Sequence, residues 1–254
     1  MLHIFADPAD MQGDLLTVRG PEVNHMKNVL RMKPGDEVSV SDGRQDKDYR
    51  YVITEFQEDA AVLNLVGVEE KDTELPVLPY LFQGLPKGEK MELVIQKAVE
   101  LGVYEIIPVS MRRCVAKLDE KRAEKKIERW QKIAEAAAMQ SKRRVIPRIH
   151  MPMTMQEAIR YAQTCADVRV LPYENQQDDG STKALLETLR EPTPDGKKKG
   201  VAVFIGPEGG FEEEEVKEAR EAGIQPISLG KRILRTETAG LMFLSWLTYL
   251  LEIS

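Results

Sequence analysis

Two patterns of hydrophobic and polar residues divide the chain, and the first extends to residue 72. Residues 37–41 read Glu-Val-Ser-Val-Ser, a strict alternation that predicts a half-buried strand, and the Asp42-Gly43 that follows is typical of a hairpin turn. The β-rich segments 49–54 and 60–68 continue this pattern, and only residues 25–31 have a helical character. We therefore expect residues 1–72 to form a small, mostly-β, barrel-like domain.

Beyond the charged connector at residues 69–76, short apolar runs alternate with segments of helical spacing. This alternation predicts an α/β domain at residues 73–254, with a mostly parallel sheet covered by helices on both faces. The expected strands are 77–83, 104–109, 168–171, 201–205 and 227–229. The expected helices are 89–101, 119–140, one that begins at Thr154, 181–190, 212–222, and one that begins near Thr238.

The composition is that of a globular protein, with 42% hydrophobic and 31% charged residues among 254. Cys114 and Cys165 are far apart and the three histidines are scattered, so no metal site is predicted and both thiols are expected to be reduced. The first residues do not have the pattern of a signal peptide, and the longest apolar stretch, 239–251, is too short to span a bilayer. These features favour a cytoplasmic protein without a membrane segment.

The net charge of −6 argues against nucleic-acid binding only as an average over the whole chain. Between Met111 and His150 there are thirteen basic and five acidic residues, a local excess that could engage phosphates. Within 119–131 the pattern is better explained by a solvated helix with ion pairs four residues apart. Arg112-Arg113 and residues 142–144 lie outside that helix and have few acids beside them, so a functional role is favoured for them.

A glycine turn, residues 206–210 (Gly-Pro-Glu-Gly-Gly), lies between the apolar run 201–205 and the acidic run 212–215. It is therefore a strand-to-helix turn, which is where open α/β sheets bind their ligands. The turn contains no Lys or Arg, and Glu208 with the four glutamates that follow surrounds it with negative charge, so we expect it to repel phosphates and to tolerate a neutral or cationic molecule. Its glycines could equally serve backbone geometry alone.

Loops that follow the last three predicted strands, 172–174, 206–210 and 229–238, should meet at one edge of the sheet. In the last of them, Arg235 and Glu237 lie among apolar residues, so both are expected to face a partly desolvated site. The alternatives are an intrachain ion pair, or a Glu237 that merely occupies the first turn of a helix. The apolar helix 239–251 is either a core helix or part of a subunit interface.

Several motifs in order along the chain resemble the RsmE family, ribosomal RNA small-subunit uridine N3-methyltransferases of the knotted SPOUT class. They are His25 to Arg31 (HMKNVLR), Gly84 to Gly88 (GLPKG), Gln96 to Gly102 (QKAVELG), Gln140 to Arg143 (QSKR) with Pro147, Gly206 to Phe211 (GPEGGF), Leu229-Gly230, and Ile233 to Ala239 (ILRTETA). One departure is Met139, which stands where the family often has an acid.

The resemblance implies an α/β fold with a trefoil-knotted, mostly parallel sheet, preceded by a PUA-like barrel that helps to hold RNA. It also implies a homodimer that methylates N3 of a uridine in 16S ribosomal RNA, free or in the assembled subunit. S-adenosylmethionine should bind in a bent form in the knot. The implied cofactor contacts are Leu171, Tyr173, Glu174, Ile205, Gly206, Pro207, Glu208, Gly209, Gly210, Leu229, Gly230, Ile233, Leu234, Thr236, Thr238 and Ala239.

For the chemistry, Arg235 is expected to stabilise the anion that forms when N3 loses its proton, and Glu237 to accept that proton or orient the arginine. The candidate RNA contacts are Arg19, His25, Lys27, Arg31, Arg44, Arg112, Arg113, Lys142 and Arg143. Two alternatives stay open: a SPOUT enzyme that methylates a ribose 2′-hydroxyl, and a non-catalytic RNA-binding or ribosome-assembly protein. The first usually has an Asn in its third motif, whereas this chain reads Leu-Gly-Lys-Arg at 229–232.

Overall fold

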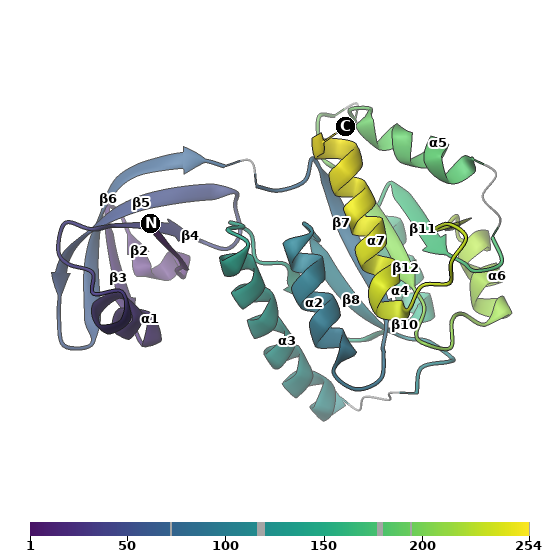
Figure 1. Cartoon of the computed structure of the whole chain (residues 1–254), viewed down its shortest axis with the longest axis horizontal. Helices are drawn as coiled ribbons and strands as arrows, with labels where there is room; N and C mark the ends of the chain where they lie inside the picture. The colour runs from purple at the N-terminus through teal and green to yellow at the C-terminus, as the bar shows by residue number, and fades with distance from the viewer. Residues whose placement is uncertain (72, 116–119, 177–179, 194, 254) are drawn as a thin grey trace. The chain divides into compact units, whose positions relative to one another are not determined.

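The computed structural model describes residues 1–71, 73–115, 120–176, 180–193 and 195–253, which form two compact units (Figure 1). The first unit comprises Met1–Glu74 and Ala138–Ile146, and the second comprises Leu75–Ala137 and Pro147–Ser254. The chain therefore enters the first unit twice. Residues 138–146 belong to it although the sequence pattern placed them in the α/β domain.

The first unit is a six-stranded sheet in the order β1-β4-β5-β6-β3-β2. Its strands are β1 (Leu2–Phe5), β2 (Met11–Gln12), β3 (Leu15–Arg19), β4 (Glu37–Ser41), β5 (Lys47–Phe56) and β6 (Ala60–Glu70). β1 pairs with β4 in parallel, and the other neighbours are antiparallel. The three predicted strands are confirmed as β4, β5 and β6, while β1, β2 and β3 were not predicted.

Helical structure in the first unit begins earlier than expected, at Pro21. A short α1 (Pro21–Asn24) runs into a single π-helical turn, η2 (His25–Val29), and η1 (Pro8–Asp10) is a 3₁₀ turn. Val23 and Met26 anchor this segment in a core formed by apolar side chains from β1 and β3 to β6. The rest of the turn faces solvent, which explains why its sequence has little amphipathic periodicity.

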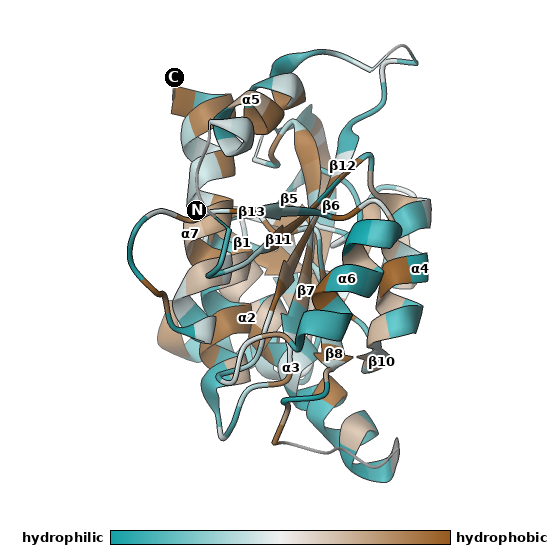
Figure 2. Cartoon of the chain, turned by 90° about the vertical axis from the view of Figure 1, so that its right-hand side faces the viewer, coloured by the Kyte–Doolittle hydropathy of each residue, from teal (hydrophilic) through white to brown (hydrophobic). Residues whose placement is uncertain are grey.

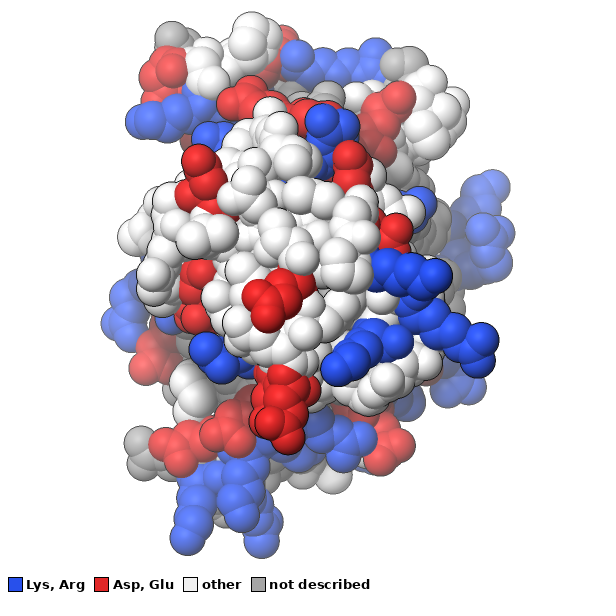
Figure 3. Space-filling view, turned by 90° about the vertical axis from the view of Figure 1, so that its left-hand side faces the viewer, with Lys and Arg blue, Asp and Glu red and all other residues white. Residues whose placement is uncertain are grey.

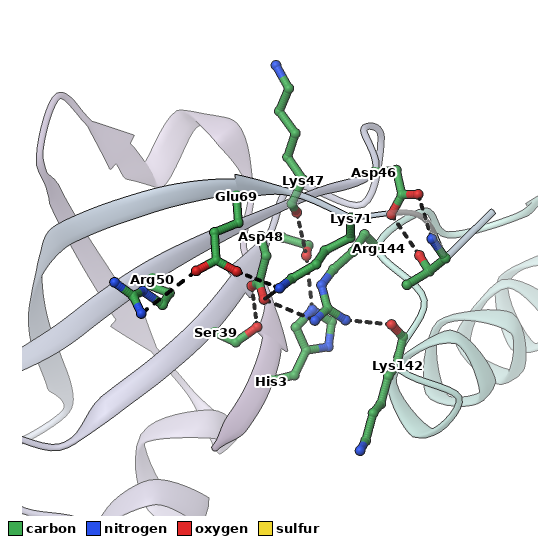
Figure 4. Close-up of polar contacts among 12 residues, drawn as sticks. His3, Ser39, Asp46, Lys47, Asp48, Arg50, Glu69, Lys71, Lys142 and Arg144 are labelled. Carbon is green, nitrogen blue, oxygen red and sulfur yellow. Dashed lines mark hydrogen bonds and ion pairs between the residues drawn. The ribbon is translucent and has the colours of Figure 1, made fainter.

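Residues 138–146 are attached to the first unit by buried charges. Asp48 of β5 is 5% exposed; it accepts a hydrogen bond from Ser39 and contacts Arg144 Nη2 through Oδ2 at 3.1 Å (Figure 4). Arg143 donates through Nε to Glu74 Oε1 at 2.9 Å and is 4% exposed. The Ile146 N–H donates to the Gly43 carbonyl at 2.9 Å. The functional role favoured for Arg143 and Arg144 as cations open to phosphates was therefore wrong, because both side chains are buried and pair with Glu74 and Asp48.

The second unit is a parallel sheet in the order β10-β8-β7-β12-β11-β13, with β9 paired to β8. Its strands are β7 (Val77–Gly84), β8 (Glu105–Ser110), β9 (Arg148–Ile149), β10 (Met153–Thr154), β11 (Val168–Pro172), β12 (Lys199–Ile205) and β13 (Gln225–Ile227). All their pairings are parallel. The predicted sheet is confirmed, although β13 lies two residues before its expected position.

Helices cover both faces of this sheet, as Figure 2 shows, with α2 and α7 on one side and α4 and α6 on the other. The helical segments are α2 (Lys90–Glu100), α3 (Glu120–Gln140), α4 (Met155–Cys165), α5 (Ser181–Glu187), η3 (Thr188–Arg190), α6 (Glu213–Glu221), α7 (Thr236–Thr248) and η4 (Tyr249–Ile253). The predicted helices are thus confirmed, apart from residue 119, which lies outside the described residues. α7 begins two residues before its expected start.

Local signals explain several of these boundaries. Thr154 and Glu157 form the reciprocal capping box that starts α4, and Gly102, with φ of +84°, follows the end of α2. In the core, the rings of Phe82 and Phe204 stack with centroids 4.3 Å apart. None of the described helices is both long and apolar enough to cross a membrane.

Candidate active site

The carboxyl ends of four neighbouring parallel strands lie at one edge of the second sheet. In register, Ile205 of β12 pairs with Gln83 of β7, and Pro172 of β11 pairs with Ile227 of β13. The loops that follow β11, β12 and β13 line a cavity of about 400 Å³ within this unit. The predicted convergence of these loops at a ligand-sized cavity is therefore confirmed.

The glycine turn packs directly on β7. A Cβ atom on Gly84 would lie 2.7 Å from the backbone nitrogen of Pro207 and 3.0 Å from the carbonyl oxygen of Ile205. Gly210 has a φ of +70°, which favours glycine, and its N–H donates to the Pro207 carbonyl at 2.9 Å. The glycines thus serve backbone geometry and also line the cavity, and their contact with a ligand stays a prediction.

A chain of short polar contacts links the start of α7 to the glycine turn. The hydroxyl of Thr236, which is buried, donates to the Gly206 carbonyl at 2.6 Å. Gln83 donates through Nε2 to the Thr236 hydroxyl at 2.8 Å. Because Gln83 is fully buried at the end of β7, these bonds fix the loop after β13 against the turn after β12.

Lys90, which no sequence pattern singled out, brings positive charge to the site. Its ammonium lies 3.1 Å from Glu208 Oε1 and 3.2 Å from Glu237 Oε2. Burial tends to raise the pKa of Glu208, but hydrogen bonds from the Glu208 and Lys87 backbone N–H groups and the Lys90 charge lower it overall. The pKa of Glu237 is lowered by its own backbone N–H and by Lys90, against partial burial. Both side chains are therefore carboxylates at neutral pH.

Arg113 forms hydrogen bonds with the glycine turn and with the acidic run that follows it. It donates through Nε to Glu212 Oε1 and through Nη1 to the Gly209 carbonyl, both at 2.8 Å. The Arg112 backbone N–H donates to Glu215 Oε1 at 2.9 Å. The acidic run after the turn is thus partly compensated, and the expected rejection of phosphates by uncompensated acids needs correction. Arg113 contacts the turn itself rather than offering a free guanidinium to RNA.

Most of the predicted cofactor contacts line the cavity. These are Tyr173, Glu174, Ile205, Gly206, Pro207, Glu208, Gly209, Gly210, Leu229, Gly230, Ile233, Leu234, Thr236 and Ala239, with the predicted catalytic Arg235. Leu171 and Thr238 do not line it, because Leu171 is buried in the core and Thr238 is exposed on α7. The lining also contains Lys90, Pro172, Phe211, Ser228, Lys231 and Arg232, which were not predicted.

The two predicted catalytic residues have different surroundings. Glu237 is 18% exposed and lies against Lys90, outside the cavity lining itself. Arg235 is exposed at the N-cap of α7, so the expectation that it is partly desolvated was wrong. The cation paired with Glu237 is therefore Lys90. The position of Lys90 could have indicated it. Because β7 lies next to β12 in the sheet, the loop after β7 reaches the same edge, and Lys90 follows that loop.

The candidate RNA contacts of the first unit are exposed. Arg19, His25, Lys27, Arg31 and Lys142 all face solvent, whereas Arg143 is buried and is withdrawn from this set. Val29 and Leu30, beside Lys27 and Arg31, are exposed apolar residues. Figure 3 shows a largely uncharged surface surrounded by Lys and Arg side chains, with Asp and Glu side chains among them.

Comparison with known proteins agrees with this arrangement. Residues 73–248 match the family described as an RNA methyltransferase domain, and residues 18–66 match the RNA methyltransferase PUA domain. The chain is 36% identical to ribosomal RNA small subunit methyltransferase E of Bacillus subtilis, over 93% of this chain and 91% of that protein. These matches define an RNA methyltransferase that carries a PUA domain, as the PUA-like prediction anticipated.

Two solved structures give the same result in three dimensions. Ribosomal RNA small subunit methyltransferase E from Neisseria gonorrhoeae, bound to S-adenosyl methionine, is 30% identical with a TM-score of 0.81 over 98% of each chain. A methyltransferase from Legionella pneumophila in complex with the same cofactor is 31% identical with a TM-score of 0.78, over 97% of this chain and 96% of that one. The chain belongs to the ribosomal RNA small subunit methyltransferase E family.

Proposed function

We propose that this protein transfers a methyl group from S-adenosylmethionine to N3 of a uridine in 16S ribosomal RNA. The observation that carries the proposal is the cavity of about 400 Å³ at the carboxyl edge of the parallel sheet. Its lining loops contain the motifs that resemble the RsmE family. The relatives from Bacillus subtilis and Neisseria gonorrhoeae, which carry the name ribosomal RNA small subunit methyltransferase E, support the substrate class.

The residues present fit the cofactor. Ile205, Leu229, Leu234 and Ala239 supply apolar surface for an adenine ring, and the absence of side chains at residues 206, 209 and 210 leaves backbone groups accessible. Glu174 and Glu208 offer negative charge for the ammonium and sulfonium groups. When bound, the cofactor supplies an electrophilic methyl group and leaves as a neutral thioether. We include in the proposal the knotted SPOUT topology, which membership of the family supports.

The residues of the chain would act on N3 of uracil. N3 carries a proton that must be lost before the nitrogen can attack, and the resulting negative charge spreads to O2 and O4. Arg235, exposed at the mouth of the cavity, is placed to meet this charge. The lowered pKa of Glu237 makes it a weak base, which favours a role in orienting the N3–H group over a role as final proton acceptor. Catalysis would then rest on positioning and electrostatics.

Mass spectrometry of 16S ribosomal RNA nucleosides tests the proposal. RNA from cells that lack the gene should contain no N3-methyluridine at the target, and purified protein with S-adenosylmethionine should restore it. Arg235→Ala and Glu237→Gln should each slow single-turnover methylation about 100-fold at saturating cofactor, as expected when a positioned group is lost. Appearance of a 2′-O-methylated nucleoside instead would overturn the N3 assignment. A protein that binds no cofactor by calorimetry would be the non-catalytic alternative.

The exposed basic side chains of the first unit are the proposed RNA contacts, together with Arg112 of the second unit. Replacing both Lys27 and Arg31 with glutamine should weaken binding of a 16S fragment. The slope of log K against log salt concentration should become shallower by about 1.4, the value for two contacts to single-stranded phosphates. Lys183→Gln is the matched control, because this lysine is 84% exposed in α5 of the second unit. An unchanged slope in the double variant would contradict this assignment.

Two further parts of the proposal concern the state of the protein. The apolar character of α7, with Tyr249 and Ile253 exposed just after it, supports a homodimer that buries this end of the chain. A mass of 28.8 kDa by light scattering at micromolar concentration would contradict the dimer.

The free Cys114 and Cys165 support a reducing, cytoplasmic location, which fractionation of cells would test.

A further inference from the structure

We propose that Lys90 is a positioning residue that holds Glu208 and Glu237 in one arrangement beside the cofactor cavity, so that Glu237 stays ionised and oriented during methyl transfer. The three residues come from three separate elements. Lys90 opens α2, Glu208 lies in the glycine turn after β12, and Glu237 lies in the first turn of α7. The effect on catalysis rests on the proposed function, whereas the contact of Lys90 with the two glutamates is independent of it.

The geometry makes Lys90 the shared partner of two carboxylates. Its ammonium lies 3.1 Å from Glu208 and 3.2 Å from Glu237, and the three side chains are 32%, 29% and 18% exposed. Glu208 is also held by the Lys87 backbone N–H at 3.1 Å. Among the described residues, Glu237 has no such second clamp from another element. Its orientation therefore depends on Lys90 more than that of Glu208 does.

The buried oxygen of Glu237 retains acceptor capacity. Oε2 is shielded from solvent and faces the Lys90 ammonium at 3.2 Å, a contact that leaves part of the acceptor capacity of this oxygen unused. A buried carboxylate oxygen with unused lone pairs is costly unless a donor reaches it in the functional complex. The N3–H of a bound uracil is a donor of that kind, and Lys90 would keep the oxygen ionised and directed until it arrives.

Removing Lys90 would change the charge balance of the site. Lys90 is the cation in contact with both carboxylates, and the exposed Arg235 also lowers the pKa of Glu237 by its charge. Without the Lys90 ammonium, two carboxylates would share a partly buried space with no cation in contact with either. Like charges in such a site disfavour double ionisation, so the pKa of Glu237 would rise. Mutual repulsion would also turn Glu237 away from its position, and a displacement of about 1 Å can cost about 100-fold in rate.

Lys90 contributes little to the packing of its own helix. The buried face of α2 consists of Met91, Val94, Ile95, Ala98 and Val99, whereas Lys90 is partly exposed at the helix start. A lysine-to-methionine change at this position keeps the length of the side chain and its helix propensity. We therefore expect variants at residue 90 to fold, which makes their catalytic behaviour interpretable.

The test compares Lys90→Met with Lys90→Arg and with Lys87→Met, the matched control. Lys87 lies three residues earlier and is exposed, and its bond to Glu208 comes from the backbone N–H, which the substitution keeps. Single-turnover methylation at saturating cofactor should fall about 100-fold in Lys90→Met, recover most of the loss in Lys90→Arg, and be unchanged in Lys87→Met. In the plot of the single-turnover rate against pH, the acidic limb should lie about one pH unit higher for Lys90→Met than for the wild type.

A second measurement reads the contact without activity. The Glu237 carboxyl carbon, assigned in ¹³C NMR spectra by its loss in Glu237→Gln, should titrate about one unit higher in cofactor-free Lys90→Met than in the wild type. Adding Glu208→Gln to Lys90→Met should bring the titration back down, because the repelling carboxylate is gone. An unchanged Glu237 titration would overturn the positioning role. If the wild type proved unable to methylate uridine, the proposed function would fail. The titration would still show whether Lys90 controls the ionisation of Glu237.

Discussion

Replacing Gly84 with alanine is expected to weaken cofactor binding strongly. The new Cβ atom would lie too close to backbone and ring atoms at the start of the glycine turn. The distances are 2.7 Å to Pro207 N, 2.8 Å to Pro207 Cδ and 3.0 Å to Ile205 O. No flexible side chain can move aside, so the glycine turn itself must shift away from β7. Overpacking of this kind costs about 1–3 kcal/mol, and the displaced turn would no longer shape the cavity. Calorimetry with S-adenosylmethionine should show a loss of affinity of about 5- to 150-fold, which is the equivalent of that cost.

The matched control for this variant is Gly67→Ala. Gly67 lies in β6 of the first unit, and the nearest atoms to its added Cβ belong to the flexible guanidinium of Arg50, at 3.5 Å and beyond. This variant should bind the cofactor as the wild type does. If Gly84→Ala also bound it normally, the close contact between β7 and the glycine turn would have no part in forming the site. A circular dichroism spectrum like that of the wild type would show that the loss is local.

Replacing Arg144 with methionine should destabilise the first unit by about 3–5 kcal/mol, the range for breaking a buried ion pair by removing one partner. Asp48 would remain almost fully buried, with Lys71 Nζ at 3.9 Å as its remaining cationic contact among the described residues. Urea unfolding followed by circular dichroism measures the effect. Arg50→Met is the control, because Arg50 is 41% exposed and lies 3.7 Å from Glu69, so its loss should cost no more than about 1 kcal/mol.

His3 provides a second test of the same cluster. Burial and the nearby Arg144 charge lower the pKa of His3 to about 4, against an opposing effect of Asp48. A histidine whose pKa is lower in the folded than in the unfolded state destabilises the fold as pH falls from 6.5 towards 4, because the unfolded chain binds the proton more readily. In Arg144→Met the His3 pKa should move back towards 6.5, which proton NMR of the imidazole ring would detect. An unchanged titration would contradict the proximity of the two groups.

Strands with a strong local signal were predictable. β12 is a continuous apolar run, so its position inside a sheet covered on both faces follows from side-chain pattern alone. β4 alternates strictly, but the prediction that it is half-buried was wrong, because Ser39 and Ser41 on its polar face are buried as well. β3 was missed although Gly13-Asp14 and Gly20-Pro21 bound it, and β1 depends on parallel pairing with a strand more than thirty residues away. The second entry of the chain into the first unit could not be predicted, because it depends on Arg143 and Arg144 meeting acids distant in sequence.

The site was predictable where glycine and loop positions define it. The parallel topology alone brings residues 172–174, 206–210 and 229–236 to one edge, and the cavity is there. The charges were not predictable, because they depend on which side chains from other elements reach the loops. Lys90 and Arg113 compensate the acids beside the glycine turn, and Arg235 faces solvent. A run of like charges in the sequence therefore gave a misleading estimate of the local potential.

The discontinuous first unit also has a consequence for synthesis of the protein. Asp48 and Glu74 lack their guanidinium partners until Arg143 and Arg144 have left the ribosome. At 5–20 residues per second, the interval between Glu74 and Ile146 lasts roughly 4–14 seconds. Limited proteolysis of chains stalled before and after this segment emerges would show whether the barrel stays open in between. The first unit would then be completed only after the first strands of the second unit have been synthesised, which couples the folding of the two units during translation.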